Sequence, residues 1–101
     1  MDSAQIRGKG AATEVLFDSA LEISRARDLY ERLNQALASN APLNLVGGHI
    51  ARIDSAALQV LAVFCRTARE RGIPVRWSTT SPVLLQAAEL LGLTDILQVQ
   101  P

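Results

Sequence analysis

One stretch, residues 50–72, constrains the fold of this chain more than any other part of the sequence. Its first four residues favour an extended backbone, and Asp54 and Ser55 then form a polar turn. After the turn, apolar residues recur at spacings of three and four, which predicts a helix over residues 55–71 that ends at Gly72. Its apolar face contains Leu58, Leu61, Ala62, Cys65 and Ala68.

Three further apolar residues of this helix, Val60, Val63 and Phe64, widen the apolar band beyond one stripe. If a sheet covers the Leu58 side, these three side chains face solvent or a neighbouring helix. An exposed patch of this kind would be a protein-binding surface. The alternative is burial against the helix that begins at Val83, and the sequence leaves both open.

Shorter segments of the same two kinds make up the rest of the chain. Strand-like sequence covers residues 13–17, 43–46 and 73–77, and an extended path is expected for residues 21–23. Helical spacing covers residues 25–39, with Ser24 as N-cap, and residues 83–91, with a short helix or turn at 94–97. Helices that alternate with single strands require crossover connections. We therefore predict an α/β fold, a four- to five-stranded mixed sheet with helices mainly on one face.

The N-terminal residues differ from the rest in composition. Residues 1–12 are polar and include Gly8 and Gly10, so we expect a flexible lead-in that holds a short edge strand at most. Residues 13–101 are expected to form a single domain, because this length with 49% apolar residues is enough for a core.

Charge and cysteine content exclude several classes of function. Ten basic and ten acidic residues give a formal charge of zero, so we expect no nucleic-acid partner. No apolar run approaches the roughly 20 residues that a membrane helix needs, so we expect no direct membrane insertion. A single cysteine, Cys65, suits a reducing compartment and, on the apolar helical face, is expected to be an inert core residue. We expect a cytoplasmic protein.

The inventory of catalytic residues is small. One histidine and one cysteine give little material for metal, thiol or acid–base chemistry. We therefore predict that the chain is not an enzyme and binds neither a metal nor a cofactor.

The turn at Asp54 and Ser55 is the strongest candidate for a functional site. A serine at the start of a helix lies beside unpaired N–H groups, where an added phosphate would be held favourably. The alternative is an ordinary helix-start serine that contributes about 1 kcal/mol of stability. Asp54 has the same two interpretations, since it could orient the metal ion of a kinase or serve as the helix N-cap.

The loop before this turn contains Gly47, Gly48 and His49. The glycines lack the spacing of a phosphate-binding loop, so we expect them to serve backbone positions with unusual dihedral angles. His49 could contact a partner or a nucleotide phosphate, although a loop histidine is usually only solvated.

Together these residues resemble the STAS domain family. The resemblance covers about residues 13–98 and depends on four segments: Ile53 to Leu58, the helix end at Ala68 to Gly72, Val75 to Trp77 with Ser81 and Pro82, and Leu90 to Leu93. The family includes anti-sigma-factor antagonists and the small cytoplasmic subunit of a bacterial lipid-asymmetry ABC transporter.

The resemblance implies a mixed sheet with helices on one side and a site at the Asp54–Ser55 turn. In the antagonists, a partner that is both serine kinase and anti-sigma factor phosphorylates a serine or threonine that falls here on Ser55. An acidic family segment falls on residues 19–22 and keeps its acid at Glu22. The sequence departs from the family at Ala57, where a glycine is frequent, and at residues 46–49, which lack the usual acid.

Three functions follow from these observations. The first is a regulatory protein-binding domain, similar to an anti-sigma-factor antagonist, that is switched by phosphorylation of Ser55. The second is the small STAS subunit of an ABC-type lipid transporter, which binds and stabilises the ATPase; the third is small-molecule binding at the rim of residues 47–55. The expected partner-binding residues are Glu22, His49, Asp54, Ser55, Ala56, Gln59, Val60 and Val63. The sequence leaves a homodimer open.

Overall fold

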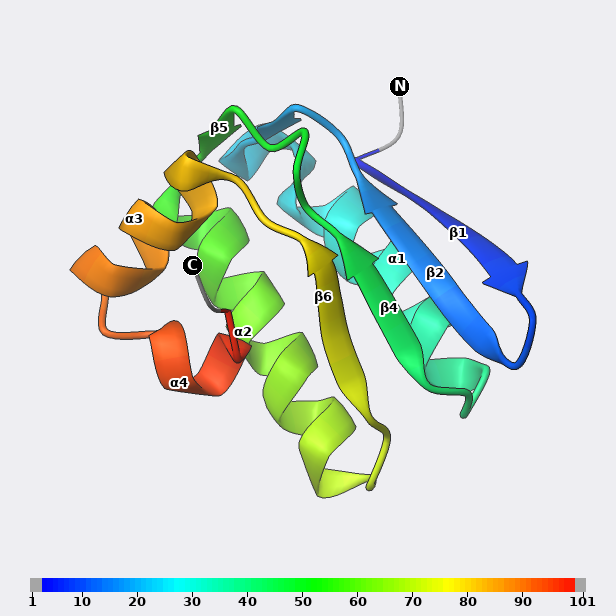
Figure 1. Ribbon diagram of the computed structural model, residues 1–101. Coiled ribbons are helices and arrows are strands. Elements are labelled where there is room, and N and C mark those ends of the chain that lie inside the picture. Colours follow the sequence, from blue (N-terminus) through cyan, green and yellow to red (C-terminus); the bar gives the residue numbers. More distant parts are fainter. Residues whose placement is uncertain (1–2, 100–101) are drawn as a thin grey trace.

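The computed structural model describes residues 3–99 (Figure 1). Four strands form the main sheet, and they are β1 (Ala4–Lys9), β2 (Ala12–Phe17), β4 (Leu43–Val46) and β6 (Val75–Thr79). Two short strands, β3 (Ala20–Leu21) and β5 (Arg52–Ile53), form a second sheet. The predicted α/β fold with a mixed sheet is confirmed.

The strand order β1-β2-β4-β6 follows from the way the strands are connected. β1 and β2 form an antiparallel hairpin, whereas β2, β4 and β6 pair in parallel. The parallel pairs need crossovers, which α1 (Ala26–Ala38) and α2 (Ser55–Glu70) provide. In Figure 1, α1 lies behind the sheet and α2 lies next to α1, alongside β6, while α3 (Pro82–Leu90) and α4 (Thr94–Leu97) lie on the same side of the molecule as α2, past β6. The expectation of helices mainly on one face is therefore confirmed.

The core lies between the sheet and the two long helices. Along β2 and β4, alternate residues such as Val15 and Leu45 are fully buried, as the two-residue period of a strand requires. Leu33 of α1 and Leu58 and Leu61 of α2 are 0–2% exposed and complete this layer. Each fully buried leucine side chain of this kind contributes about 1.5–3 kcal/mol.

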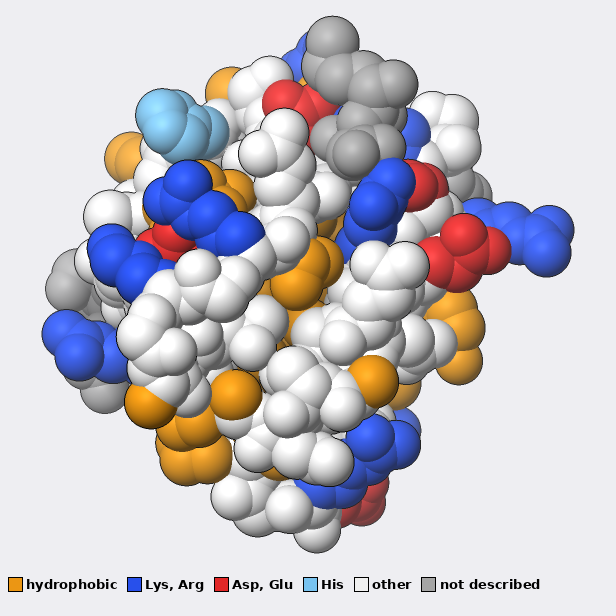
Figure 2. Space-filling view, turned by 90° about the vertical axis from the view of Figure 1, so that its right-hand side faces the viewer, with side chains coloured by type: hydrophobic (Ala, Val, Ile, Leu, Met, Phe, Trp, Pro, Cys, Tyr) orange, Lys and Arg blue, Asp and Glu red, His pale blue; other side chains and the backbone are white. Residues whose placement is uncertain are grey.

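The opposite face of the sheet is polar. Pairing places Arg7 of β1, Glu14 of β2, Asn44 of β4 and Arg76 of β6 in one row across it. Arg7 donates to Glu14 Oε1 at 2.6 Å, and this hydrogen bond holds the pKa of Glu14 below its ordinary value. On the side of the molecule seen in Figure 2, basic side chains likewise stand near acidic ones, and the hydrophobic groups are small.

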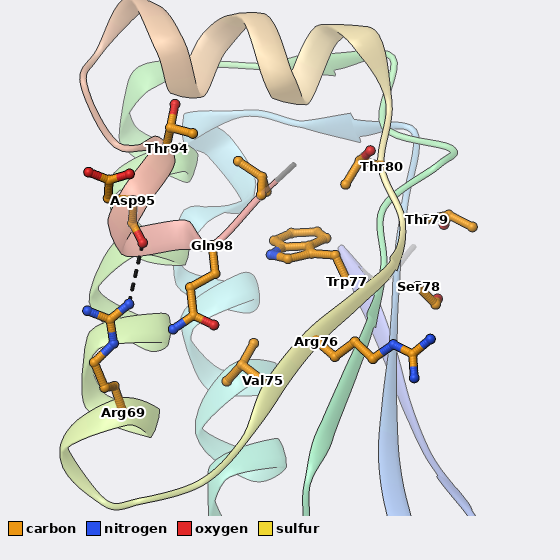
Figure 3. Close-up of a pocket in the computed structure, with 11 residues that line it drawn as sticks. Arg69, Val75, Arg76, Trp77, Ser78, Thr79, Thr80, Thr94, Asp95 and Gln98 are labelled. Carbon is orange, nitrogen blue, oxygen red and sulfur yellow. Dashed lines mark hydrogen bonds between the residues drawn. The ribbon is translucent and has the colours of Figure 1, made fainter. Parts of the chain in front are cut away.

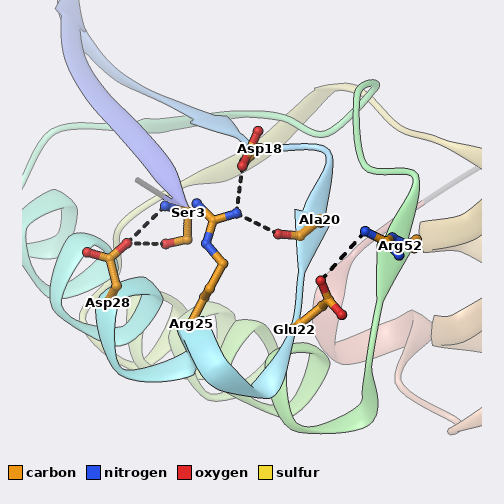
Figure 4. Close-up of polar contacts among 7 residues, drawn as sticks. All are labelled: Ser3, Asp18, Ala20, Glu22, Arg25, Asp28 and Arg52. Atoms are coloured by element: carbon orange, nitrogen blue, oxygen red, sulfur yellow. Dashed lines mark hydrogen bonds and ion pairs between the residues drawn. The ribbon is translucent and has the colours of Figure 1, made fainter. Parts of the chain in front are cut away.

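The N-terminal residues are more ordered than the sequence indicates. Residues 4–9, expected to lie in a flexible lead-in, form the six-residue edge strand β1. Ser3 anchors its start, because its N–H and Oγ donate to Asp28 Oδ2 of α1 at 2.9 and 2.7 Å (Figure 4). Residues 1 and 2 of that lead-in lie outside the described residues.

The start of α1 also differs from the prediction. Ser24 lies within a 3-10 helix, Ile23–Arg25, and α1 begins at Ala26 without a side-chain cap. The guanidinium of Arg25 instead contacts Asp18 Oδ2 and the Ala20 carbonyl at 2.6 and 2.9 Å. Contacts with the preceding turn therefore fix this helix start, and the assignment of Ser24 as N-cap was wrong.

The glycines have two separate structural roles. Gly72 has φ +71° and ends α2, with the Ile73 N–H donating to the Ala68 carbonyl at 2.8 Å, so a left-handed residue is needed there. Gly47 does not have a positive φ, contrary to our expectation of unusual dihedral angles. A Cβ atom on Gly47 would lie 2.7 Å from Cζ3 of Trp77. Glycine is required at position 47 because the indole packs directly on the backbone.

Candidate protein-binding site

The start of α2 leaves a serine exposed. Asp54 has an extended backbone, and its Oδ1 accepts a hydrogen bond from the Ala57 N–H at 3.0 Å, so the interpretation of Asp54 as N-cap is confirmed. Ser55 is the first residue of the helix, and its side chain is exposed. Because Asp54 provides the cap, the Ser55 hydroxyl stands at the positive end of the helix without serving as its N-cap.

The small β3–β5 sheet brings a second segment of the chain to this turn. The Asp54 N–H donates to the Leu21 carbonyl at 3.1 Å, which fixes the residues after β3 beside the start of α2. Glu22 is therefore close to Arg52, with 3.8 Å between Oε1 and the guanidinium nitrogen (Figure 4). Both side chains are largely exposed, so the ion pair contributes little to stability.

His49 lies on the loop that precedes β5. The loop is attached to the end of β6, because the N–H of Gly47 donates to the Thr79 carbonyl and the N–H of Gly48 to Thr79 Oγ1, both at 3.0 Å. The His49 side chain is exposed, and the next residue, Ile50, is buried. The imidazole is thus accessible to a binding protein.

Helical periodicity extends the site along α2. Ser55, Gln59 and Val63 follow one another at intervals of four residues, so they share a face, and all three are exposed. Ala56 and Val60 are half-buried beside this row. The surface of these five residues changes from polar at the helix start to apolar at Val63, whose side chain is 46% exposed.

The apolar end of this surface borders a groove between α1 and α2. The groove has a volume of about 170 Å³, and Tyr30 and Leu33 of α1 and Val60 and Val63 of α2 are among its lining residues. Val63 is therefore not buried against α3, so the alternative left open by the sequence is removed for this residue. Phe64 differs from its neighbours, since it is only 3% exposed and belongs to the core.

Two residues at this surface were not among the predicted site residues. Tyr30 has the spacing of a core residue on α1 but is 55% exposed. Residues at the centre and at the edge of an apolar helical stripe have the same spacing, so the sequence does not distinguish a buried from an exposed position. Arg52 contacts Glu22, and only the pairing of β3 with β5 reveals the contact.

Cys65 plays no part in this surface. Its side chain is 2% exposed, and burial raises the pKa of the thiol to about 12. The thiol is protonated at neutral pH and is a poor nucleophile. Within residues 3–99, no three histidine, cysteine, aspartate or glutamate side chains group as metal ligands. No helix in the same range has the length and apolar content needed to cross a membrane.

Comparison with protein-family models identifies one family. The family model described as "Mlab, STAS domain" matches residues 4–99. A sequence comparison with curated proteins gives no match.

Solved structures give the same fold at low sequence identity. An anti-sigma factor antagonist from Mycobacterium paratuberculosis superposes with a TM-score of 0.78 at 14% identity, over 97% of this chain and 84% of that one. The phosphorylated form of SpoIIAA, a cell-fate determinant of Bacillus, gives 0.67 at 12% identity, over 91% and 86% of the two chains. A protein named Mglu gives 0.68 at 15% identity, over 79% of this chain but 20% of the Mglu chain.

Proposed function

Because the chain belongs to the STAS domain family, we propose that it is a non-enzymatic regulatory domain that binds a partner protein at the start of α2. The partner is an anti-sigma factor that is also a serine kinase, or a protein of similar type. The binding surface consists of Glu22, His49, Asp54, Ser55, Ala56, Gln59, Val60 and Val63. Phosphorylation of Ser55 switches the interaction.

The observation that carries this proposal is the division of roles between Asp54 and Ser55. The Asp54 carboxylate accepts the N–H of Ala57, and the Ser55 side chain is exposed. A kinase can therefore reach the Ser55 hydroxyl without disturbing the helix cap. Similarity to SpoIIAA, whose structure was solved in a phosphorylated form, supports a switch by phosphorylation.

Charge explains how such a switch would act. A phosphate on Ser55 adds about −1.5 to −2 charges at pH 7. The dipole of α2 favours the phosphate by about 0.3–1 kcal/mol, so the modified helix remains stable. The same charge lies in the centre of the binding surface, where a partner would have to desolvate it beside Asp54. The modification therefore weakens binding without unfolding the domain.

The test is a binding measurement with a purified partner of the proposed kinase type. We expect Ser55→Glu to weaken binding at least tenfold, and Ser55→Ala to bind like the wild type but to resist phosphorylation. Ser24→Glu is the matched control, because Ser24 is also exposed and lies near a helix start. Equal affinity of the wild type, Ser55→Glu and the phosphorylated protein would refute the switch.

A second candidate function is a permanent subunit of an ABC-type lipid transporter. The apolar groove between α1 and α2 favours it, because Tyr30 and Val63 are 55% and 46% exposed and would be covered by a stable partner. Co-purification with a transporter ATPase that is lost in Val63→Asp and retained in Ser55→Glu would support this function over the first.

A further inference from the structure

The two edges of the main sheet are formed by β1 and β6. Arg7, Gly8 and Lys9 end β1, and such charged and flexible residues protect an edge against pairing with another chain. β6, with the sequence Val-Arg-Trp-Ser-Thr, has no glycine or proline and has one charged residue, Arg76. The two edges therefore differ in how well they could accept another strand.

A groove runs along the whole outer edge of β6. Its volume is about 970 Å³, and every residue of β6 lines it, with Arg69 of α2 and Thr94 and Asp95 of α4 on the other side. Figure 3 shows Val75 and Trp77 pointing toward α4, whereas Arg76 points to the opposite side. An extended segment of five residues is about 17 Å long and matches β6 in length.

The backbone of β6 is oriented for pairing in this groove. The Pro74 carbonyl accepts the Leu43 N–H at 2.8 Å, so it faces β4. The N–H and C=O groups of successive strand residues alternate in direction. Those of Val75 and Trp77 therefore face outward, into the groove, where an added strand would bond to them.

The polar row of Arg7, Glu14, Asn44 and Arg76 lies on the open face of the sheet, opposite the core. This row indicates the chemistry of the added strand. In this row Arg7 pairs with Glu14, and Asn44 Nδ2 donates to the other oxygen of Glu14 at 3.4 Å. The row ends at Arg76, which has no ion-pair partner within residues 3–99. Opposite charges on directly opposed residues of neighbouring strands stabilise a sheet. An acidic residue opposite Arg76 would complete the row.

We propose that β6 binds an extended segment of a partner protein by strand addition, and that the segment has an acidic residue between two apolar residues. The acid pairs with Arg76 on the open face, and the apolar residues lie beside Val75 and Trp77. A second copy of this chain fits less well, because β6 itself contains no acidic residue. The site is separate from the proposed Ser55 surface.

The test is titration of ¹⁵N-labelled protein with the capped peptide Thr-Val-Glu-Val-Thr, followed by amide NMR. We expect chemical-shift changes along residues 75–79 and slower hydrogen exchange at the Val75 and Trp77 amides. A matched peptide with lysine in place of glutamate should bind about threefold to tenfold more weakly. In Arg76→Glu protein this preference should reverse, so that the lysine peptide binds better.

Three results would overturn the proposal. The first is a set of shift changes confined to the Ser55 surface or absent altogether. The second is equal binding of the two peptides by both proteins. The third is concentration-dependent protection of the β6 amides without peptide, which would identify a second copy as the occupant. Ser55→Glu should bind the peptide like the wild type, so failure here is distinguishable from failure of the phosphorylation switch.

Discussion

Helices α1 and α2 each begin soon after a strand of the small sheet, and each has a serine at or near its start. The polar side chains at the two helix starts nevertheless have different hydrogen-bond partners. Near the start of α1, Arg25 contacts Asp18, and Asp28 accepts two hydrogen bonds from Ser3, so these groups connect the helix to β1 and to the turn after β2 (Figure 4). At the start of α2, Asp54 caps its own helix.

This difference separates a structural helix start from one that is open to a partner. The polar side chains of α1 contact other elements, and losing them would disturb the packing of those elements. The cap of α2 is local, within three residues, and leaves Ser55 exposed. The predictions below test this separation, from the largest expected effect to the smallest.

Ser3→Ala should have the largest effect on stability. The substitution removes the hydrogen bond from Ser3 Oγ to the Asp28 carboxylate at 2.7 Å, and Ser3 is fully buried. A hydrogen bond to a charged group contributes about 1.5–3 kcal/mol, and we expect the free energy of unfolding in urea to fall by about that amount. A loss below 0.5 kcal/mol would show that β1 is not anchored through this contact.

Asp54→Ala should cost less, because only a local cap is lost. An N-cap contributes about 1 kcal/mol, and the free energy of unfolding should fall by that amount. Asp54→Asn keeps an oxygen that can accept the Ala57 N–H and serves as the control, with a smaller loss expected. Equal losses in the two variants would contradict the capping role.

Acidification should affect the α1 start. The hydrogen bonds from Ser3 hold the pKa of Asp28 below its ordinary value, and the Arg25 guanidinium does the same for Asp18. A carboxylate with a lowered pKa in the folded state stabilises above its unfolded pKa of about 3.9, and this contribution is lost as the pH falls through the folded value. These groups should therefore cause no loss between pH 7 and 5, and a progressive loss below about pH 4.

Asp28→Asn separates this contribution from the general effect of acid. The variant should be less stable than the wild type at pH 7, and the difference should shrink as the pH is lowered below 4. Thermal unfolding of both proteins across this range provides the measurement. A difference that is independent of pH would mean that the charge of Asp28 does not contribute.

Ser24→Ala and Ser55→Ala should have the smallest effects, each within about 0.5 kcal/mol in urea unfolding. Neither serine provides the N-cap of the helix that it precedes or begins. A loss near 1 kcal/mol in Ser55→Ala would show that the Ser55 hydroxyl helps to hold the start of α2, and the separation of roles would then fail.

The features that sequence reasoning predicted correctly depend on residues close together in the chain. The turn at Asp54 and the helix end at Gly72 are local, because the cap reaches Ala57 and the closing hydrogen bond joins residues 68 and 73. The alternation of strands and helices likewise fixes the parallel crossovers.

The errors concern residues whose partners lie in other elements of the structure. Ser24 matches the pattern of an N-cap, but the contact of Arg25 with Asp18 decides where α1 begins. Gly47 is required by the indole of Trp77, which lies 30 positions later in the sequence. The placement of β1 as an ordered edge strand depends in part on the contact between Ser3 and Asp28, which are 25 positions apart. Local pattern cannot anticipate any of these three contacts.

The burial of Cys65 has a practical use. Because the Cys65 thiol stays protonated at neutral pH and its side chain is 2% exposed, maleimide reagents should not label it in the native protein. Ser55→Cys or Ser78→Cys would then carry a fluorophore or a spin label at one defined position, with the native cysteine left in place. A single-label protein of this kind allows distances from either surface to a bound partner to be measured directly.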